Sequence, residues 1–495
     1  MKFSVRRKAF WTSIVLLIGA FCGRLLTVNV LACVLTPLAL LACGVLLYFL
    51  KKKALLLALA IAMALGVAAS VTDYFTRYDG DVTGERTVQG RLCEKRSYGY
   101  LLEDIVIEGE SYHGKLLVIG STDGKEIGKI VTMTAQVETL SRDPFDAYDS
   151  SFYNDRIYYR TRTFETIRVE EGKKALHESI RERIDEGMRI YVSEENAGLL
   201  KSLLFGDKAE LSPEDKETMN GIGLAHVFAV SGLHVGFLTA IVLFLLRKGK
   251  VNGVVSTVVV VALLSLYGLL TGFPTGLKRV SVALAVSYAG RALTRKADPP
   301  TTLGVAAALI VLTNPRELFD VGFLMSFVSV LGIICYYRPI YECLKKAGTN
   351  RIFTYAFGLI ATTVSACLFI LPISLEIFGS FSPYAILSNL FIVPMVSVAF
   401  PFAAIAAFFG SVWSGFGTLF LPAAYIVEGI RLVAGAFSRL PYSSLAVSGM
   451  GAFAILYYAT LLLCSRFFRI PKASKYTLIF GTSASFVVLA VLAIV

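Results

Sequence analysis

Charged residues are scarce in this sequence, and the motifs of several common site types are missing from it. Asp, Glu, Lys and Arg make up 17% of the 495 residues, hydrophobic residues make up 55%, and mean hydropathy is +0.66. A soluble protein of this size carries more charge than that. The sequence also has no GxxxxGK[ST] phosphate loop and no zinc-like pairing among its eight cysteines. These absences exclude a soluble globular class, a nucleotide-driven motor and a cysteine-ligated zinc site.

Long apolar runs take the place of the missing charge. Many of them reach the roughly 20 residues that cross a bilayer as a helix. The sequence therefore predicts a polytopic α-helical membrane protein with about 11 to 13 spans or half-spans. The first three spans are expected near residues 9–23, 28–50 and 54–72. Since the second run follows the first directly, we expect a retained first helix rather than a cleaved leader.

The net charge of +12 is distributed unevenly along the chain. Residues 73–190 contain 18 Lys and Arg against 23 Asp and Glu, whereas the remainder contains 30 against 13. Basic loops mark the cytoplasmic side of membrane helices, so this excess indicates orientation more than nucleic-acid binding. We expect a multi-pass protein of the cell membrane whose N-terminus is cytoplasmic. The polar region and the C-terminal residue Val495 are then extracytoplasmic.

The polar region after the third span changes to short β-type runs separated by glycine-containing turns. Four or five such strands predict a small barrel or sandwich, with an OB-fold as one candidate. The following sequence, LHESIRERIDEGMRIYV and beyond, is amphipathic and predicts helices that either lie on the outer membrane surface or form a packed connector. The expected domains are an N-terminal membrane segment, an OB-like domain, surface helices and a second transmembrane domain, at residues 1–72, 73–172, 173–221 and 222–495.

A basic and aromatic patch, SFYNDRIYYRTRTF, ends the β-type region. Bases stack on aromatic rings while arginine neutralises phosphates, so this alternation fits contact with a single strand. The alternative is a solvated strand edge, because the domain as a whole is acidic. The residues concerned are Arg156, Tyr158, Tyr159, Arg160 and Arg162.

The stretch GLAHVFAVSGLHVG, residues 223–236, places polar groups at the start of a long apolar run. It contains His226, Ser231 and His234. Polar side chains in a spanning helix are functional-site candidates because hydrocarbon offers them no partner. The alternative is a packed helix pair, because Gly232 and Gly236 form a small-xxx-small pattern.

Three more features place polar or helix-breaking residues near the membrane. Lys278 and Arg279 lie at the outer mouth of a helix, where they favour either an anionic substrate or lipid phosphates. Asp320 begins a later span, so it is expected to pair with one of these cations or to take part in transport. Near Asn389, the prolines at 383, 394 and 401 predict an interrupted or re-entrant segment.

Five segments in order resemble the competence region of the ComEC family of DNA-uptake channels. They are LLKSLLFGDKAELS, GLAHVFAVSGLHVG, GFPTGLKRV, NPRELFDVGFLMSF and FGSFSPYAILSNLFIVP, and the likeness is strong over roughly residues 196–400. The resemblance implies an inner-membrane channel that passes one DNA strand into the cytoplasm during natural transformation. It also implies a ComEA-like DNA receptor outside and a ComFA-like motor inside. It suggests that His226, Ser231, His234, Lys278, Arg279, Asp320 and Asn389 line the channel.

The sequence departs from the family pattern in two ways. Many ComEC proteins continue into a metallo-β-lactamase-like domain with an HxHxDH metal cluster, but none of His113, His177, His226 and His234 stands two residues from another. We therefore expect no nuclease site, metal or cofactor in this chain, which is a naturally short form, works with a separate nuclease or is truncated. The family arginine after the short loop corresponds here to Lys278-Arg279, and either cation could align with it.

Two other classes of function fit parts of the sequence. A secondary transporter of a small anion or a lipid would also use cations and broken helices within the membrane. An intramembrane hydrolase could use Ser231 with His234, three residues apart on one helical face. The hydrolase is the weaker alternative, because neighbouring helical side chains rarely form a hydrogen-bonded dyad and no third residue is identifiable.

Overall fold

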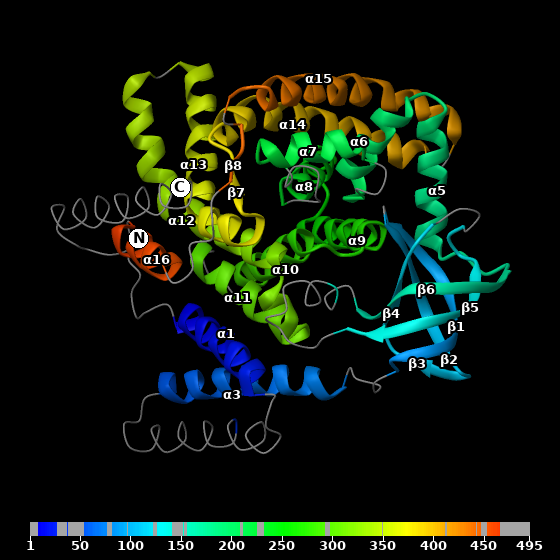
Figure 1. Cartoon of the computed structure of the whole chain (residues 1–495). Coiled ribbons are helices and arrows are strands. Elements are labelled where there is room, and N and C mark those ends of the chain that lie inside the picture. Colours follow the sequence, from blue (N-terminus) through cyan, green and yellow to red (C-terminus); the bar gives the residue numbers. More distant parts are fainter. Residues whose placement is uncertain are drawn as a thin grey trace.

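The apolar runs form a bundle of helices, and the polar region forms a β-barrel beside it (Figure 1). The structure is a computed structural model. It describes residues 8–26, 37, 54–76, 82–96, 98–121, 126–140, 152, 156–207, 211–224, 232–292, 298–348, 350–410, 413–441, 443–446 and 453–465. The predicted class, a polytopic α-helical membrane protein with a small β-domain near its N-terminal part, is confirmed.

The first two described helices, α1 (Lys8–Leu26) and α3 (Ala54–Thr76), cross at very short range. An ideal Cβ on Gly19 would lie 2.3 Å from the Met63 carbonyl oxygen, and one on Gly66 would lie 2.2 Å from that of Leu16. Glycine is required at both positions because only hydrogen leaves room for the facing backbone. The helices cover the predicted spans at 9–23 and 54–72, whereas the span at 28–50 falls outside the described residues apart from Pro37.

Five strands close into a barrel. Strand β1 (Gly84–Arg96) pairs antiparallel with both β2 (Gly99–Ile107) and β5 (Ile130–Thr139). On the other side, β2 pairs with β4 (Lys115–Ile119), β4 runs parallel to β6 (Ile157–Glu170), and β6 pairs with β5. The short β3 (Glu110–Tyr112) extends β2. This closed order, with its single parallel pair between the third and fifth barrel strands, is the topology of the predicted OB-fold.

The barrel interior follows from the alternation of side chains along each strand. Val88, Gly90 and Leu92 of β1 are buried, whereas the residues between them are partly or fully exposed. Tyr100 and Leu101 of β2 are both fully buried in the hydrophobic cluster of the barrel domain. Burial raises the pKa of the Tyr100 hydroxyl because the ionised form loses its hydration.

Three helices connect the barrel to the bundle: α5 (Leu176–Arg189), α6 (Glu194–Phe205) and α7 (Pro213–Gly221). Helix α7 begins after Ser212, whose hydroxyl accepts a hydrogen bond from the Asp215 amide at 3.0 Å. Helix α6 is a packed connector, because Leu199, Leu200 and Leu203 are fully buried in the core of the bundle. The expected position of these helices on the outer membrane surface stays a prediction.

The remaining elements form most of the bundle. They are α8 (Gly232–Lys248), α9 (Gly253–Thr271), α10 (Thr275–Ala292), α11 (Pro299–Thr313), η1 (Pro315–Phe319), α12 (Val321–Leu344), η2 (Lys345–Ala347), α13 (Arg351–Phe378), β7 (Ser380–Phe381), α14 (Ala385–Gly410), η3 (Ser414–Leu419), α15 (Phe420–Ser438), β8 (Leu445–Ala446) and α16 (Phe453–Cys464).

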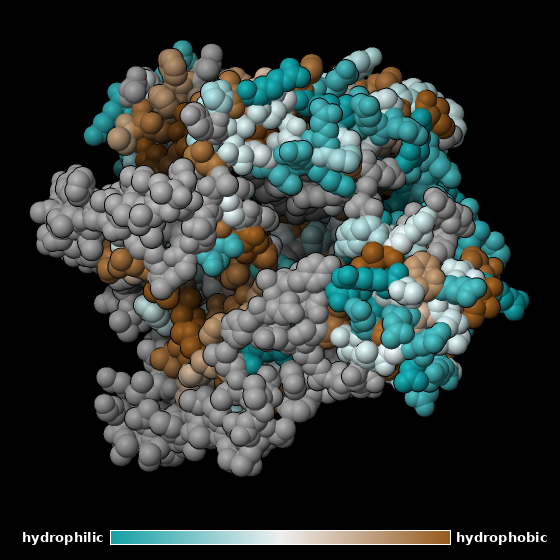
Figure 2. Space-filling model, viewed as in Figure 1, coloured by the Kyte–Doolittle hydropathy of each residue, from teal (hydrophilic) through white to brown (hydrophobic). Residues whose placement is uncertain are grey.

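Within the described ranges, five helices are long and apolar enough to cross a membrane. They lie at Gly253–Thr271, Val321–Leu344, Phe353–Ile377, Ala385–Gly410 and Gly415–Ser438, and four shorter apolar helices accompany them. Figure 2 shows hydrophilic residues gathered over the barrel and α5, and hydrophobic residues over α12 and α13. The C-terminal residue Val495 lies outside the described residues, so its extracytoplasmic position stays a prediction.

Helix α14 corrects the prediction of a broken segment. It runs without interruption over 26 residues, with Pro394 and Pro401 inside it. The amide that Pro394 lacks would have bonded to the Leu390 carbonyl. The Ser397 hydroxyl donates to a different carbonyl, that of Val393, at 2.7 Å. Proline is tolerated in membrane helices when nearby groups and neighbouring helices compensate for the lost backbone bond. The prolines therefore mark a packed helix rather than a re-entrant loop.

Cys93 in the barrel provides a test of this core. Burial raises the pKa of its thiol to about 12, so at pH 9 it stays protonated, whereas an unfolded cysteine with a pKa of about 8.5 is mostly thiolate. Only the thiolate is nucleophilic, so iodoacetamide should alkylate folded Cys93 about 100-fold or more slowly than the same residue in urea. Mass spectrometry of a variant whose only cysteine is Cys93 measures both rates.

The matched control is a variant that keeps only Cys343, which is exposed. Its rate should change little on unfolding. Because the pKa of Cys93 is raised in the folded protein, this thiol also reduces stability as the pH rises above the unfolded value toward 12. Equal alkylation of folded and unfolded Cys93 would contradict the buried position.

Candidate functional site

The start of α10 carries two adjacent cations with different surroundings. The Lys278 amine forms an ion pair with the Glu317 carboxylate of η1. The Lys278 side chain is 33% exposed, and that of Glu317 is 2% exposed. A carboxylate this deep requires a counter-charge, because an isolated buried ion is strongly disfavoured. The acid that meets Lys278 is therefore Glu317, and the expected pairing with Asp320 is wrong.

Arg279 has no such carboxylate. Its Nε donates a hydrogen bond to the Ser326 hydroxyl of α12 at 2.7 Å. Among the described residues, no acidic side chain lies within 4.0 Å of its guanidinium. A positive charge that is largely removed from water and not neutralised attracts anions. Arg279 is thus a candidate anion-binding group of the described bundle.

The start of α8 packs directly on this arginine. An ideal Cβ on Gly232 would lie 2.6 Å from Nη2 of Arg279 and 3.2 Å from Cγ2 of Val280. Any side chain at position 232 would therefore displace the guanidinium. Gly236, one turn later, has nothing within 4 Å of its own ideal Cβ. The two glycines of the predicted small-residue pattern therefore differ: Gly232 makes room for Arg279, and Gly236 does not pack on anything described.

His234 faces the opposite neighbour, α14. It is fully buried, and its ring lies 4.7 Å from that of Phe400, centroid to centroid, with an interplanar angle of 32°. Phe400 also contacts Tyr267 of α9, whose hydroxyl donates to the Leu204 carbonyl of α6 at 2.7 Å. His234 therefore belongs to an aromatic contact that joins α6, α8, α9 and α14.

The N-terminal part of α14 meets the turn that leads toward the stretch 223–236. Gly223 has φ +75°, and its ideal Cβ would lie 3.3 Å from Cβ of Ala385. The Ser388 hydroxyl points at the Ile222 carbonyl at 3.4 Å. Asn389 is 5% exposed, and its Oδ1 accepts no hydrogen bond from the described part of the chain. A polar atom buried without a partner is destabilising unless water or a ligand satisfies it.

The structure thus brings together some, but not all, of the residues that the sequence predicts for the site. Lys278 and Arg279 lie with Gly232 and the described part of the stretch 223–236. Asp320 lies at the N-terminus of α12, where its Oδ1 accepts from the Phe323 amide at 2.7 Å. His226 and Ser231 fall outside the described residues, so their predicted roles remain predictions.

Two functional neighbours were missed by sequence reasoning. Glu317 and Ser326 both lie in the quoted segment NPRELFDVGFLMSF, yet only Asp320 was selected from it. One available signal was that Ser326 is a polar residue in the otherwise apolar run that follows Asp320. In the same segment, Arg316 forms a buried pair with Asp73 of α3 at 2.6 Å, which ties the N-terminal helices to η1.

The predicted aromatic surface of the barrel needs correction. Tyr158 and Tyr159 are 6% and 2% exposed and belong to the barrel core, so their rings are not available for stacking on bases. Arg160 forms an ion pair with Glu138 at 2.8 Å. Arg156 and Arg162 are exposed, and contact between these arginines and DNA remains a prediction.

No three His, Cys, Asp or Glu side chains come close enough to hold a metal ion within the ranges that the structure describes. What the described site offers is a fixed cation, hydroxyl groups and an amide oxygen on packed helices. Such groups can hold and orient an anion.

Comparisons with known proteins identify relatives of this region. A sequence model of the family described as "Competence protein" matches residues 203–471, more than half of the chain. The chain is 25% identical over 276 residues to ComE operon protein 3 of Bacillus subtilis, covering 55% of this chain and 34% of that protein. It is 26% identical over 211 residues to Recombination protein 2 of Haemophilus influenzae, covering 40% and 27%.

A further relative is the uncharacterized protein YcaI of Escherichia coli, 24% identical over 209 residues, covering 41% of this chain and 27% of that protein. The chain spans between a quarter and about a third of the length of these three relatives. No solved structure matches the chain.

The Lys278–Glu317 pair yields a stability test. Replacing Lys278 with Met leaves the buried Glu317 carboxylate without its lysine, so the variant should lose about 2 to 4 kcal/mol of stability. The double variant Lys278→Met/Glu317→Gln should recover most of that loss, because no buried charge remains. Thermal unfolding in detergent measures both, with Lys346→Met at an exposed position as the control. A double variant no more stable than Lys278→Met would show that the pair is not what holds Glu317.

Proposed function

The chain belongs to the competence protein (ComEC) family, and we propose from this that it is a channel that passes single-stranded DNA from outside into the cytoplasm during natural transformation. The chain itself performs no catalysis in this proposal. The substrate is a polyanion with one phosphate per nucleotide, and the protein provides a path and a set of reversible contacts along it.

Arg279 is the observation that carries the proposal. It is a cation on α10 whose Nε donates to Ser326 and whose guanidinium packs against Gly232, with no acidic partner in the described bundle. A passing phosphate would neutralise it, and the planar guanidinium suits two phosphate oxygens at once. Lys278 already shares its charge with Glu317. One uncompensated cation at this level gives a contact weak enough to release each phosphate in turn.

The path would run beside the segments that meet at Arg279. In the proposal, residues 223–236, including His226, Ser231 and His234, form one wall, and α14 near Asn389 forms another. In this arrangement, water or the DNA strand donates the hydrogen bond that the Oδ1 of Asn389 lacks. Asp320, at the N-terminus of α12, lies at the mouth of this path in the proposal.

The domain division and the orientation belong to the same proposal. Residues 1–72 form a membrane segment, 73–172 the OB-like domain, 173–221 the connecting helices and 222–495 the channel domain. The distribution of basic loops supports a cytoplasmic N-terminus, an extracytoplasmic barrel and an extracytoplasmic C-terminus. OB-folds commonly bind single strands, which supports a role for the barrel before the strand enters.

Energy and strand delivery must come from other proteins in this proposal. The sequence has no GxxxxGK[ST] loop, so a ComFA-like motor would pull from the cytoplasm. A ComEA-like receptor would present DNA outside, and a separate nuclease would supply the single strand. The same Arg279 geometry suits transport of another anion, and the test below separates the two.

Substitution of Arg279 tests the channel directly. Arg279→Gln removes the charge and keeps a polar side chain, so transformation frequency should fall about 10- to 100-fold, the loss expected for one charge-assisted contact. Arg279→Lys should lie between this variant and the original. Both are measured in the organism of origin at equal protein abundance. If Arg279→Gln transforms at the wild-type frequency, Arg279 does not line the path. If a strain that lacks the whole chain transforms at the wild-type frequency, the protein transports another anion.

The two glycines of α8 give a matched pair of variants. Gly232→Ala pushes on the guanidinium of Arg279, so it should lower transformation about 10-fold, whereas Gly236→Ala meets nothing described and should have less than a 2-fold effect. Gly232 begins α8 and Gly236 lies one turn inside it, so helix propensity favours alanine more at position 236 and cannot explain a loss confined to position 232. Equal effects of the two substitutions would break the proposed link between Gly232 and Arg279.

A further inference from the structure

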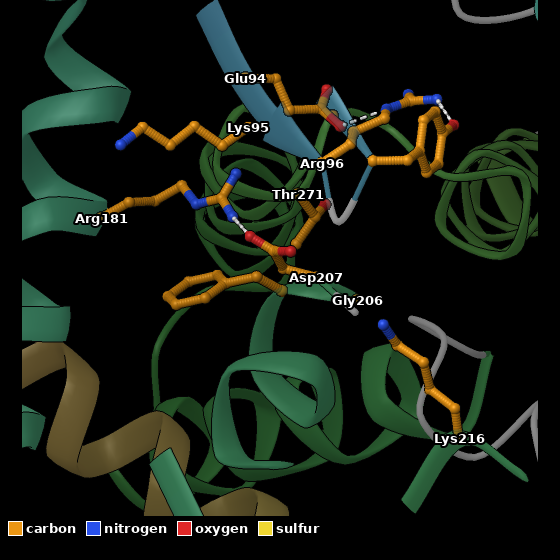
Figure 3. Close-up of a pocket in the computed structure, with 11 residues that line it drawn as sticks. Glu94, Lys95, Arg96, Arg181, Gly206, Asp207, Lys216 and Thr271 are labelled. Carbon is orange, nitrogen blue, oxygen red and sulfur yellow. Dashed lines mark hydrogen bonds and ion pairs between the residues drawn. The ribbon is translucent and has the colours of Figure 1, made fainter. Parts of the chain in front are cut away.

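A pocket of about 420 Å³ lies where the barrel meets the helices. Figure 3 shows its lining side chains. The turn between β1 and β2 contributes one wall, α5 and the end of α6 contribute another, and α7 and the outer end of α9 complete it. We name it the seam pocket. Its volume is in the range of pockets that hold small ligands, and one or two nucleotides would fill it.

Two arginines of the seam pocket are fixed by acids. Arg181 of α5 forms an ion pair with Asp207 at 2.9 Å, and its guanidinium lies 5.1 Å from the centre of the Phe205 ring. Arg96 of β1 forms an ion pair with Glu94 at 3.0 Å. These contacts neutralise both arginines and hold them in place, so they shape the pocket more than they charge it.

Two lysines remain with their full charge. Lys95 comes from the barrel and Lys216 from α7, and they enter the seam pocket from different sides (Figure 3). Both are half-buried, and neither has a carboxylate within 4.0 Å among the described residues. The seam pocket therefore has a net positive charge at the junction of two domains. Two unneutralised ammonium groups facing one cavity are suited to an anion that reaches between them.

An aromatic ring lies at the rim. Tyr98 is 45% exposed, and its hydroxyl accepts a hydrogen bond from Nη1 of Arg96 at 3.4 Å. This bond limits the positions of the ring while leaving much of the side chain in solvent. An accessible ring beside lysines is the arrangement on which an unpaired base can stack while its phosphates are neutralised. It differs from the predicted patch in β6, whose tyrosines are buried.

We propose that the seam pocket binds the phosphodiester backbone of single-stranded nucleic acid, with Lys95 and Lys216 on phosphates and Tyr98 under a base. This inference rests on the proposed function. Because the seam pocket contains residues of both the barrel and the end of α9, a strand bound there contacts the two domains at once. The seam pocket is then the point at which the barrel passes the strand to the membrane helices.

The test measures binding of a fluorescent 12-nucleotide oligothymidylate to the full chain in discs of zwitterionic lipid. Binding to single strands weakens with salt at a slope of about 0.7 per neutralised phosphate. The double variant Lys95→Gln/Lys216→Gln should therefore raise the Kd about 10-fold or more and lower the slope of log Kd against log salt by about 1.4. Tyr98→Ala should raise the Kd about fivefold without changing the slope.

The matched control is Lys173→Gln/Lys346→Gln, which removes the same charge from exposed positions outside the seam pocket. It should leave both the Kd and the slope unchanged. Equal losses in the two double variants would overturn the proposal, because net charge alone would then explain binding. A thermal unfolding midpoint for each variant within 2 °C or so of the original keeps misfolding out of the comparison.

Two further experiments test whether the seam pocket binds inorganic phosphate or a lipid headgroup instead of the strand. Inorganic phosphate at 10 mM or so should displace little of the oligonucleotide, because a single anion makes one contact where a strand makes several. If discs with about 30% phosphatidylglycerol abolish binding and the Lys95/Lys216 variant restores it, the seam pocket holds a lipid headgroup and the proposal fails. An unchanged Kd in the Lys95/Lys216 variant, together with lost transformation in Arg279→Gln, would reject the seam pocket and leave the channel standing.

Discussion

The contact between Gly232 and Arg279 is the constraint on which the candidate site depends. Arg279 can lie between α8 and α12 only because position 232 has no side chain. An ideal Cβ atom at this position would lie 2.6 Å from Nη2 of Arg279. The arginine is then close enough to donate to Ser326. A larger residue at 232 would separate α8 from α10, and the stretch 223–236 would lose its position relative to the cation. Packing and electrostatics therefore cannot be varied independently at this junction.

Paired charges hold the surrounding elements around that junction. Lys278–Glu317 joins α10 to η1, Arg316–Asp73 joins η1 to α3, and Arg431 of α15 meets both Asp215 of α7 and Glu195 of α6. On the barrel side, Arg91 binds Glu178 of α5 at 2.8 Å. The Glu178 carboxylate also accepts from the Ala175 amide at the start of α5, at 2.7 Å. Each pair connects elements that are distant in sequence, so the charges fix how separately formed helices meet.

Much of the fold could be predicted from the sequence, because local patterns determine it. Apolar runs gave the helices, and period-two strands with glycine turns gave the OB-like barrel. Features set by tertiary contacts could not be predicted in this way. Proline content suggested a break in α14, yet the helix is continuous and packs in the core of the bundle. The tyrosines of β6 were expected to be accessible for stacking on bases. On a regular strand, at least one of two adjacent side chains would face away from the barrel interior. The shift in the β4–β6 register opposite Tyr158, between Lys115 and Leu116, explains how both are buried.

The candidate site shows the same limit for charge. Sequence reasoning found Lys278 and Arg279 but could not tell which of them would be neutralised, because Glu317 and Ser326 lie some 40 residues away along the chain. The choice of serine opposite Arg279 has a physical consequence. A carboxylate there would fix the guanidinium and cancel its charge, whereas a hydroxyl fixes it and leaves the charge available. The adjacent pair shows the opposite solution, since Glu317 neutralises Lys278. Two neighbouring cations thus separate into one that holds the helices together and one that remains available to an anion.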